Sequence, residues 1–470
     1  MAAQYDLVIV GMGSAGLTAA EFASRLGLRV AAVERDKVGG DCLWTGCVPS
    51  KALLASAKAA HHIRHADRWG LPATEPAIDT ARVWARIKAV QQEIAATDDS
   101  PERFEAMGVE LIRGPARLTS PTSLTAGDRE LQTRNVLLCT GSRPAIPPIE
   151  GLEAAGFLTS ESVFELERAP ESLIAIGGGP IAIELSQAFT RLGIPTTVLQ
   201  RDPGILPKDE PALVAALAGV LEAEGVEIIC DAAVTRVEAA DGLKAVHATV
   251  GGETERIFRA HELFVAAGRR PNTDGLGLEA AGVELTASGH VKVDARLRTS
   301  VPSVYACGDL VGRFLFTHSA GAEAAGAVRT MFFPGSAKAP SFVPWATFTD
   351  PELARAGLTL AEAQAEHGAD ACELWRQDLV HSDRARADGQ AEGAILIVTA
   401  KQRVVGAHIL APAAGEMIHE LALAISQGMK LDELASLVHV YPTVAIGIQQ
   451  LAAEASYDKA GKYRWLVKKR

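Results

Sequence analysis

Two cysteines close together in the chain are the first residues with the means to do chemistry. Cys42 and Cys47 lie in the segment GGDCLWTGCVPSK, residues 39–51, and the letters PSK after them are typical of a helix start. A disulfide between them would close a very small loop, so stability is a poor reason for it. A helix N-terminus and the nearby Lys51 would instead stabilise a thiolate, which favours a reversible redox couple.

The alternatives for this pair are two unrelated buried cysteines or half of a zinc site. No second pair of cysteines or histidines at ligand spacing lies nearby in the sequence. The glycines on either side also suit close approach of the backbone to a cofactor. We therefore prefer the redox couple and expect no metal site.

A glycine-rich turn near the N-terminus predicts a dinucleotide site. The apolar run YDLVIV at residues 5–10 is typical of a buried parallel strand. It is followed by GMGSAG at residues 11–16 and by a helical segment, which is the strand, turn and helix that a bound pyrophosphate requires. The next strand ends at Glu34, which is placed to accept a hydrogen bond from an adenosine ribose.

A second unit of the same kind lies in residues 171–201, with the pattern G-x-G-x-x-A at 177–182. Two dinucleotide units in one chain imply electron transfer between two cofactors. The second strand of this unit ends at Gln200 and Arg201, where an acid would hold the ribose hydroxyl of NAD. A cation there, with Lys208 nearby, favours the phosphate of NADPH, and NADH is kept as the alternative.

Length and charge exclude several classes of protein. The chain has 470 residues, enough for roughly two to four domains, and a net charge of -11, which argues against a nucleic-acid partner. No apolar run approaches the ~20 residues that a transmembrane helix needs. The N-terminus enters a strand at once, so we expect no signal peptide. Six cysteines fit a reducing cytoplasm, in which a catalytic disulfide is maintained and an accidental one is not.

The segment around the two cysteines resembles the signature GGxCxxxGCxPSK of the class I pyridine nucleotide-disulfide oxidoreductases. This family includes dihydrolipoamide dehydrogenase, glutathione reductase and mercuric reductase. Three further segments resemble its FAD motifs, namely LLCTGSRP at 137–144, VAAGRRPNT at 265–273 and TSVPSVYACGDLVG at 299–312. The resemblance implies that hydride passes from a nicotinamide to FAD and then to the disulfide, with Cys47 facing the flavin and Cys42 attacking the substrate.

The resemblance also implies roles for single residues, beginning with a pair between Glu184 and Lys51 near the flavin and the nicotinamide. Arg269 is expected to contact the flavin, and Cys139, Cys307 and His318 to pack around it without a chemical role. The residues expected to hold FAD are Gly11, Gly13, Ser14, Ala15, Gly16, Glu34, Arg35, Gly40, Asp41, Ala116, Thr140, Gly141, Arg269, Gly308 and Asp309. Those expected to hold the nicotinamide coenzyme are Gly177, Gly179, Ala182, Arg201 and Gly268.

The motifs predict an α/β fold with two Rossmann-like dinucleotide-binding domains and a C-terminal α/β dimerisation domain. Residues 1–150 and 271–337 are assigned to an FAD-binding domain in two parts, residues 151–270 to an NAD(P)H-binding domain, and residues 340–470 to the C-terminal domain. In relatives this last domain forms a two-fold dimer and completes each active site with residues from the partner. The resemblance therefore implies a homodimer with a shared active site.

The C-terminal region departs from the family pattern. Dihydrolipoamide dehydrogenases and glutathione reductases carry a His-Pro pair followed by a glutamate, but here Tyr441 and Ile446 occupy the positions of the histidine and the glutamate. His439 is two residues early, and on an extended segment it would point to the same side as Tyr441. A tyrosine, with an ordinary pKa of about 10, is a poor base near neutrality. We therefore expect little turnover of lipoamide or glutathione disulfide.

Mercuric reductases share the tyrosine, but the tail SYDKAGKYRWLVKKR lacks their C-terminal cysteine pair. The leading hypothesis is an NAD(P)H oxidoreductase that reduces a small disulfide, a persulfide or a thiophilic metal species. The first alternative is that the flavin reduces a quinone or another diffusible acceptor, without need of the disulfide. The second is an electron-delivery or binding subunit docked through the basic tail, with Tyr463, Trp465 and Leu466; contact of this tail with a membrane surface is not favoured.

Overall fold

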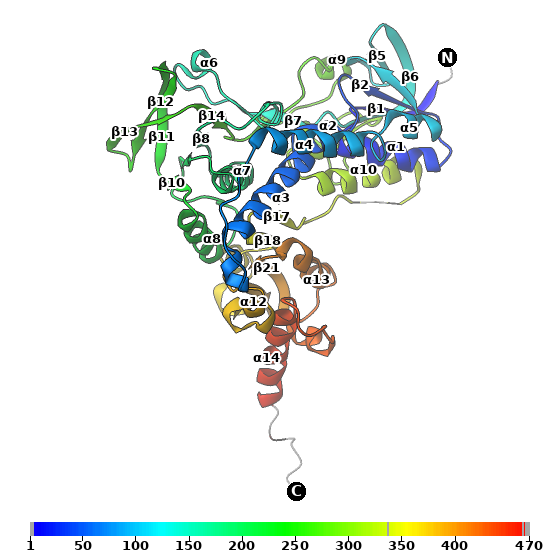
Figure 1. Ribbon diagram of the computed structural model, residues 1–470. Coiled ribbons are helices and arrows are strands. Elements are labelled where there is room, and N and C mark those ends of the chain that lie inside the picture. Colours follow the sequence, from blue (N-terminus) through cyan, green and yellow to red (C-terminus); the bar gives the residue numbers. More distant parts are fainter. Residues whose placement is uncertain (1–3, 336–337, 463–464, 466–470) are drawn as a thin grey trace.

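A computed structural model describes residues 4–335, 338–462 and 465, arranged in three lobes (Figure 1). The first lobe is built on a sheet in the order β3-β2-β1-β6-β5-β4, with β16 added beside β6. The strands β1, β2 and β16 pair in parallel with their neighbours. Their bounds are β1 Tyr5–Val10, β2 Val30–Glu34, β3 Glu110–Arg113, β4 Ala116–Ser120, β5 Ser123–Ala126, β6 Arg129–Leu138 and β16 Val304–Ala306.

Strand β1 is buried along almost its whole length, as a short continuous apolar run predicts for a central parallel strand. Helices α1 (Ser14–Arg25) and α10 (Thr317–Phe332) pack against each other on this lobe. The buried face of α1 consists of alanines and one glycine, so that the helix can lie close to its neighbours. Because β16 and α10 come from residues after 300, the chain returns to its first lobe, as the motif order predicts.

A layer of helices connects this lobe to the other two. It contains α2 (Gly40–Trp44), α3 (Cys47–Arg64), η1 (Ala66–Trp69), α4 (Thr80–Ala95) and α5 (Pro101–Ala106). Helix α3 packs against α4 and against α7 of the second lobe, and it runs from the first lobe toward the C-terminal one (Figure 1). It begins at Cys47, two residues before the proline expected to open it, so the second cysteine itself occupies a helix N-terminus.

The second lobe contains a parallel sheet in the order β10-β9-β8-β14 and an antiparallel sheet, β11-β12-β13. A two-stranded ribbon of β7 and β15 lies between the lobes. The strands are β7 Ser142–Pro144, β8 Leu173–Ile176, β9 Thr196–Leu199, β10 Glu227–Ile229, β11 Ala232–Ala240, β12 Leu243–Val250, β13 Thr254–Ala260, β14 Glu262–Val265 and β15 Arg269–Pro271. Its helical segments are α6 Leu152–Ala155, α7 Pro180–Arg191 and α8 Pro211–Ala223, whereas α9 Leu278–Ala281 and η2 Gly308–Val311 pack in the first lobe, against β4 and α10 respectively.

The C-terminal lobe is an antiparallel sheet in the order β17-β18-β21-β20-β19. Its strands are β17 Trp345–Thr347, β18 Glu352–Gly357, β19 Cys372–Asp378, β20 Ala394–Ala400 and β21 Arg403–Ala411. Its helical segments are α11 Leu360–His367, η3 Ala369–Ala371, η4 Leu379–His381, α12 Asp383–Ala387, α13 Ala414–Ser426, η5 Leu431–Ser436 and α14 Ile446–Lys462.

These sheets confirm the predicted fold class, while the residue boundaries assigned to the domains stay predictions. Among the helices that the structure describes, none is long and apolar enough to cross a bilayer. The expectation about the basic tail falls largely on residues outside the described part of the chain. Of the three residues named for that tail, the structure describes only Trp465.

Close packing at the first turn of α1 leads to a prediction. A Cβ atom added at Gly16 would lie 2.0 Å from the Gly11 carbonyl oxygen, and neither backbone can move away easily. We expect Gly16→Ala to lower the free energy of unfolding by about 3 kcal/mol, the upper part of the overpacking range. The matched control is Gly219→Ala in α8, where an added Cβ meets no atom within 4 Å, and which should be slightly stabilising.

Circular dichroism of both variants during urea unfolding measures this difference. Equal stability of the two would show that the glycine turn tolerates a side chain.

Candidate functional site

One large cavity, of about 1890 Å³, lies where the three lobes meet. It contains the turns before α1 and α7, the segment with the two cysteines, and residues from the start of α10 and from β17. Of the residues expected to bind cofactors, its lining includes Gly11, Gly13, Ser14, Ala15, Glu34, Arg35, Gly40, Asp41, Ala116, Thr140, Gly141, Gly308, Asp309, Gly177, Gly179, Arg201, Gly268 and Arg269. Gly16 and Ala182 are buried inside the packing of α1 and α7 and lie outside this lining.

The first glycine turn has the geometry of a dinucleotide cradle. Gly11 has φ of +98°, and a Cβ there would lie 2.5 Å from the carbonyl oxygen of Cys139, so only glycine fits. Glu34 accepts hydrogen bonds from the backbone N–H groups of Met12 at 2.7 Å and Asp36 at 2.9 Å. The carboxylate therefore holds the turn in place and also lines the cavity, and its contact with a ribose stays a prediction.

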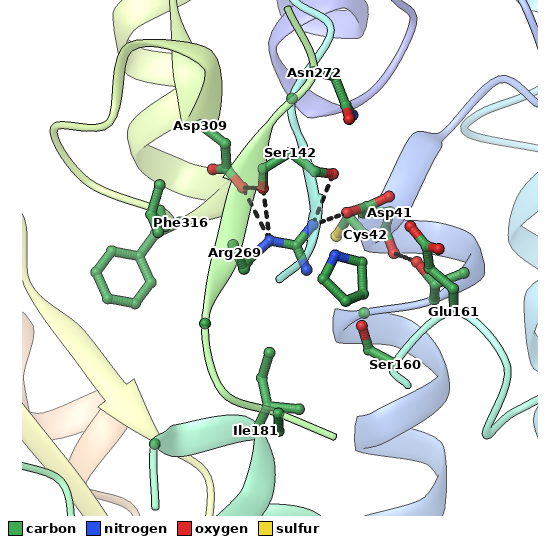
Figure 2. A pocket seen from close by; sticks show the side chains of 18 of the residues that line it. Asp41, Cys42, Ser142, Ser160, Glu161, Ile181, Arg269, Asn272, Asp309 and Phe316 are labelled. Carbon is green, nitrogen blue, oxygen red and sulfur yellow. Dashed lines mark hydrogen bonds and ion pairs between the residues drawn. The ribbon is translucent and has the colours of Figure 1, made fainter. Parts of the chain in front are cut away.

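Arg269 lies at the centre of a charged network in this cavity (Figure 2). Its guanidinium is ion-paired with Asp41, donates to the Ser142 hydroxyl at 2.6 Å and carbonyl at 3.0 Å, and lies 3.4 Å from Asp309. These contacts hold the guanidinium in the wall of the cavity, and its contact with a flavin stays a prediction. Burial raises the pKa of Asp41, although Arg269 opposes that shift.

Several lining residues escaped sequence reasoning. Glu161 faces the same network, and burial followed by the charge of Asp41 raises its pKa. Ile181 and Phe316 project into the cavity below Arg269 (Figure 2). No sequence motif predicted these three residues. Each contributes its shape or its charge to the cavity, and its neighbours there come from other elements of the fold.

Cys139, Cys307 and His318 all line the cavity, and their packing around a flavin stays a prediction. Cys139 and Cys307 are both buried, and their sulfur atoms are 3.6 Å apart. His318 lines the cavity, stacks on Phe316 with ring centroids 5.4 Å apart, and lies 2.7 Å from the Pro344 carbonyl oxygen. These contacts are packing and hydrogen bonding within the wall of the cavity.

The two thiols of the redox segment have different environments. Cys42 lies in α2, and Cys47 is the first residue of α3, with its sulfur 3.3 Å from the Thr317 hydroxyl at the start of α10. The hydrogen bond from the Cys42 thiol lowers the pKa of Cys47 to about 6, with further help from Thr317 and the charge of Lys51. The pKa of Cys42 is raised by its hydrogen bond with Cys47 and by burial. At neutral pH the geometry therefore favours a thiolate on Cys47 and a thiol on Cys42.

Lys51 and Glu184 form an ion pair that links all three lobes. The Lys51 ammonium nitrogen lies 2.8 Å from one Glu184 oxygen, and the other oxygen accepts the backbone N–H of Phe348 at 2.8 Å. Lys51 also lies 4.3 Å from the centre of the Phe348 ring. Glu184 is only 5% exposed, so its charge is buried but compensated on both oxygens.

Gln200 and Arg201, at the coenzyme end of the cavity, differ in their exposure to solvent. Gln200 is buried against Gly178, and its amide donates to Asp202 at 3.1 Å and to the Gly204 carbonyl at 3.3 Å. The side chain of Arg201 is 84% exposed and 3.9 Å from Asp202. The strand end thus offers one exposed cation at the rim of the cavity and no carboxylate at the position of Gln200.

The C-terminal residues correct one expectation. His439 and Tyr441 do not point to the same side, because the segment is not a regular strand. The nearly buried His439 ring has Nε2 3.0 Å from Glu420 on α13, whereas the exposed Tyr441 hydroxyl donates to Asp383 on α12 at 3.0 Å. That hydrogen bond raises the pKa of Tyr441.

Neither of these two described side chains lines the large cavity of its own chain. Glu420 and Asp383 could not be found from the sequence, because both lie far from residues 439–441 in the chain. Among the described residues, no cluster of three or more histidine, cysteine or acidic side chains is arranged to hold a metal ion.

Comparisons with known proteins agree along almost the whole chain. Residues 5–324 match the family model described as pyridine nucleotide-disulphide oxidoreductase, and residues 343–452 match its dimerisation domain. A dihydrolipoyl dehydrogenase of Thermus scotoductus is 35% identical over 97% of this chain and 98% of its own length. A mercuric reductase of Acidithiobacillus ferrooxidans is 34% identical over 97% of this chain and 83% of its own.

Solved structures show the same fold. The flavoprotein disulfide reductase RclA from Escherichia coli, described as HOCl-induced, superimposes with a TM-score of 0.84 at 26% identity, over 96% of this chain and 99% of that chain. LpdA from Mycobacterium tuberculosis gives a TM-score of 0.87 at 27% identity, with the same coverage of both chains.

The different environments of the two thiols predict a selective reaction. In the reduced protein, the rate of alkylation of Cys47 by iodoacetamide should rise with pH and reach half its maximum near pH 6, because only the thiolate reacts. Cys42 should react only at much higher pH, because its pKa is raised. Peptide mass mapping after short exposures between pH 4 and 10 measures both rates. A faster reaction of Cys42 at neutral pH would contradict this assignment of the two thiols.

Proposed function

The chain belongs to the pyridine nucleotide-disulphide oxidoreductase family, whose members depend on FAD and use NAD(P)H, and we propose that it passes electrons from NADPH through FAD to a Cys42–Cys47 disulfide and on to a small acceptor. The proposed acceptor is a disulfide, a persulfide or a thiophilic metal species. The observation that carries this proposal is Cys47, which lies at the N-terminus of α3 with Thr317 and Lys51 beside its sulfur.

The residues of the cavity fit FAD. The glycine turn before α1 lines the cavity, where its backbone can approach a pyrophosphate, and Glu34 and Asp309 line the same cavity. Bound FAD supplies two-electron chemistry, accepting a hydride and reducing the disulfide. The protein's own contribution is to hold the Lys51–Glu184 pair, with Glu184 nearly buried, between the helices that follow the cysteines and the second glycine turn.

The thiols then divide the chemistry between them. Reduction of the disulfide by two electrons leaves a thiolate on Cys47 and, after uptake of one proton, a thiol on Cys42. Cys42 passes its proton to the neighbouring Cys47 thiolate and attacks one sulfur of a disulfide substrate, so that a mixed disulfide forms and the other sulfur is expelled and takes a proton. Cys47 then attacks Cys42, which restores the internal disulfide and releases the second substrate thiol.

The proton for the expelled sulfur is assigned to Tyr441 of the partner subunit. The dimerisation domain supports a homodimer, and we infer that it brings the exposed 439–441 segment of one subunit to the cysteines of the other. Because Asp383 raises the pKa of Tyr441, its hydroxyl stays protonated at neutral pH and can donate but not abstract a proton. The nearly buried His439, held by Glu420, is assigned a structural part in the same segment.

A thiophilic metal ion is the acceptor that this arrangement favours over a bulky disulfide, because it needs no general base. One crystal structure of the relative RclA is described as a Cu(II) complex, with a TM-score of 0.84 at 25% identity. A diffusible acceptor such as a quinone, reduced directly by the flavin, is the second candidate function. It differs in not requiring Cys42 or Cys47, so replacement of Cys42 should abolish turnover of a disulfide or a metal ion but not that of a quinone.

We expect Cys42→Ser to lower NADPH-dependent reduction of disulfides or metal ions by at least about 10³-fold, the scale expected when a covalent nucleophile is removed. Cys372→Ser, a half-buried cysteine of the C-terminal lobe, is the matched control and should retain full activity. Steady-state NADPH oxidation with a small aromatic disulfide, Cu(II), Hg(II) and a benzoquinone measures this. Full turnover of the disulfide or the metal ions by Cys42→Ser would contradict electron transfer through the Cys42–Cys47 disulfide. Survival of quinone turnover alone would be compatible with either function.

Coenzyme choice has its own test. Removal of the exposed Arg201 guanidinium should raise the KM for NADPH roughly 10-fold, the scale of a charge-assisted hydrogen bond, and leave the KM for NADH almost unchanged. Arg259→Ala, an exposed arginine on β13, serves as the control. A preference of the unchanged enzyme for NADH would contradict the assignment of NADPH.

A further inference from the structure

A short helix lies between the two cysteines, and its end is capped from outside the redox segment. Helix α2 contains Cys42, ends at Trp44, and is followed closely by Cys47 at the start of α3. The last carbonyl groups of a helix have no partner within it. Here the carbonyl oxygens of Leu43 and Trp44 accept hydrogen bonds from the side-chain amide of Gln91, at 3.1 Å and 2.7 Å.

Gln91 is a buried amide on the apolar face of α4. It is only 5% exposed and shares that face with Trp84 and Ile87, both fully buried. Long polar side chains are seldom placed in such surroundings unless their hydrogen bonds are made. Both of its partners are carbonyl oxygens, so it must be the amide nitrogen that faces α2. Figure 1 shows α4 lying beside α2 and α3.

The rest of the segment is held from other directions. The indole nitrogen of Trp44 donates to the Val38 carbonyl at 2.8 Å, and Lys37 lies 4.6 Å from the centre of the Trp44 ring. The sulfur of Cys47 contacts Thr317. Gln91 is therefore the side chain that fixes the backbone between the cysteines, while other groups fix its two ends.

The cap also has an electrostatic effect on the thiolate. Carbonyl oxygens at a helix C-terminus carry partial negative charge, and those of Leu43 and Trp44 lie shortly before Cys47 in the chain. The amide hydrogens of Gln91 offset that charge. Without them, two unpaired oxygens would disfavour a second negative charge on the sulfur, and the segment would be free to move away from α3.

We propose that Gln91 is a positioning residue for the redox pair, holding the Leu43 and Trp44 carbonyl groups so that Cys42 and Cys47 stay within reach of each other and Cys47 is maintained as a thiolate. This inference rests on the proposed function, in which those cysteines carry the electrons. It adds a residue from α4, outside the cysteine segment, to the parts that determine how readily the pair is reduced.

The test uses the holoenzyme reduced anaerobically with NADPH. A thiolate next to oxidised flavin gives a long-wavelength charge-transfer absorbance, and its dependence on pH reports the pKa of Cys47. We expect Gln91→Leu, which keeps the size but removes the donor, to move this midpoint upward by roughly half a unit to one unit. Gln92→Leu, its exposed neighbour on α4, should leave it unchanged.

The possible outcomes separate this inference from the function on which it rests. A normal band in the unchanged enzyme, with the same midpoint in Gln91→Leu and only a lower melting temperature, would assign Gln91 a merely structural role and overturn the inference alone. Absence of the band from the unchanged enzyme would overturn the proposed function and this inference with it. If Gln91→Leu fails to fold, Gln91→Asn, which keeps the amide but shortens its reach, must shift the midpoint upward for the inference to stand.

Discussion

The ion pair between Lys51 and Glu184 is the contact on which the arrangement of the site depends. Lys51 comes from the helix after the cysteines and Glu184 from the helix after the second glycine turn, while Phe348 of the C-terminal lobe supplies the second hydrogen bond. A buried carboxylate is costly unless its charge and its hydrogen bonds are both satisfied. The three lobes meet at this point, and all three residues line the large cavity.

Asymmetry between two chemically identical thiols follows from the groups around each sulfur. The hydrogen bond with Cys42, the Thr317 hydroxyl at the start of α10 and the charge of Lys51 all favour negative charge on the sulfur of Cys47, which also lies at the N-terminus of α3. Cys42 lies inside a short helix and keeps its proton. The direction of electron flow that we propose, toward Cys47 first and outward through Cys42, is the one that this difference in proton affinity supports.

Acidic partners for the C-terminal segment come from unexpected places. The position where relatives carry a glutamate is Ile446, yet His439 finds Glu420 on α13 and Tyr441 finds Asp383 on α12. Both contacts join elements that are distant in the chain but adjacent in the lobe. Where the residue type differs from that of relatives, the neighbouring acidic side chain also comes from a different element. For Tyr441, the neighbouring Asp383 favours a role as proton donor over a role as base.

The sequence by itself determined the features that depend on local backbone geometry. Glycine turns, the spacing of the cysteines and the order of the motifs predicted the fold class, the family and a set of cofactor residues of which most line the cavity, because steric demands at a tight turn leave few residue types. Only the tertiary structure decided which partners the charged and polar side chains take. Arg269 pairs with Asp41, His439 turns toward Glu420, and Gln91 caps α2, because each contact depends on the distance between elements far apart in the chain.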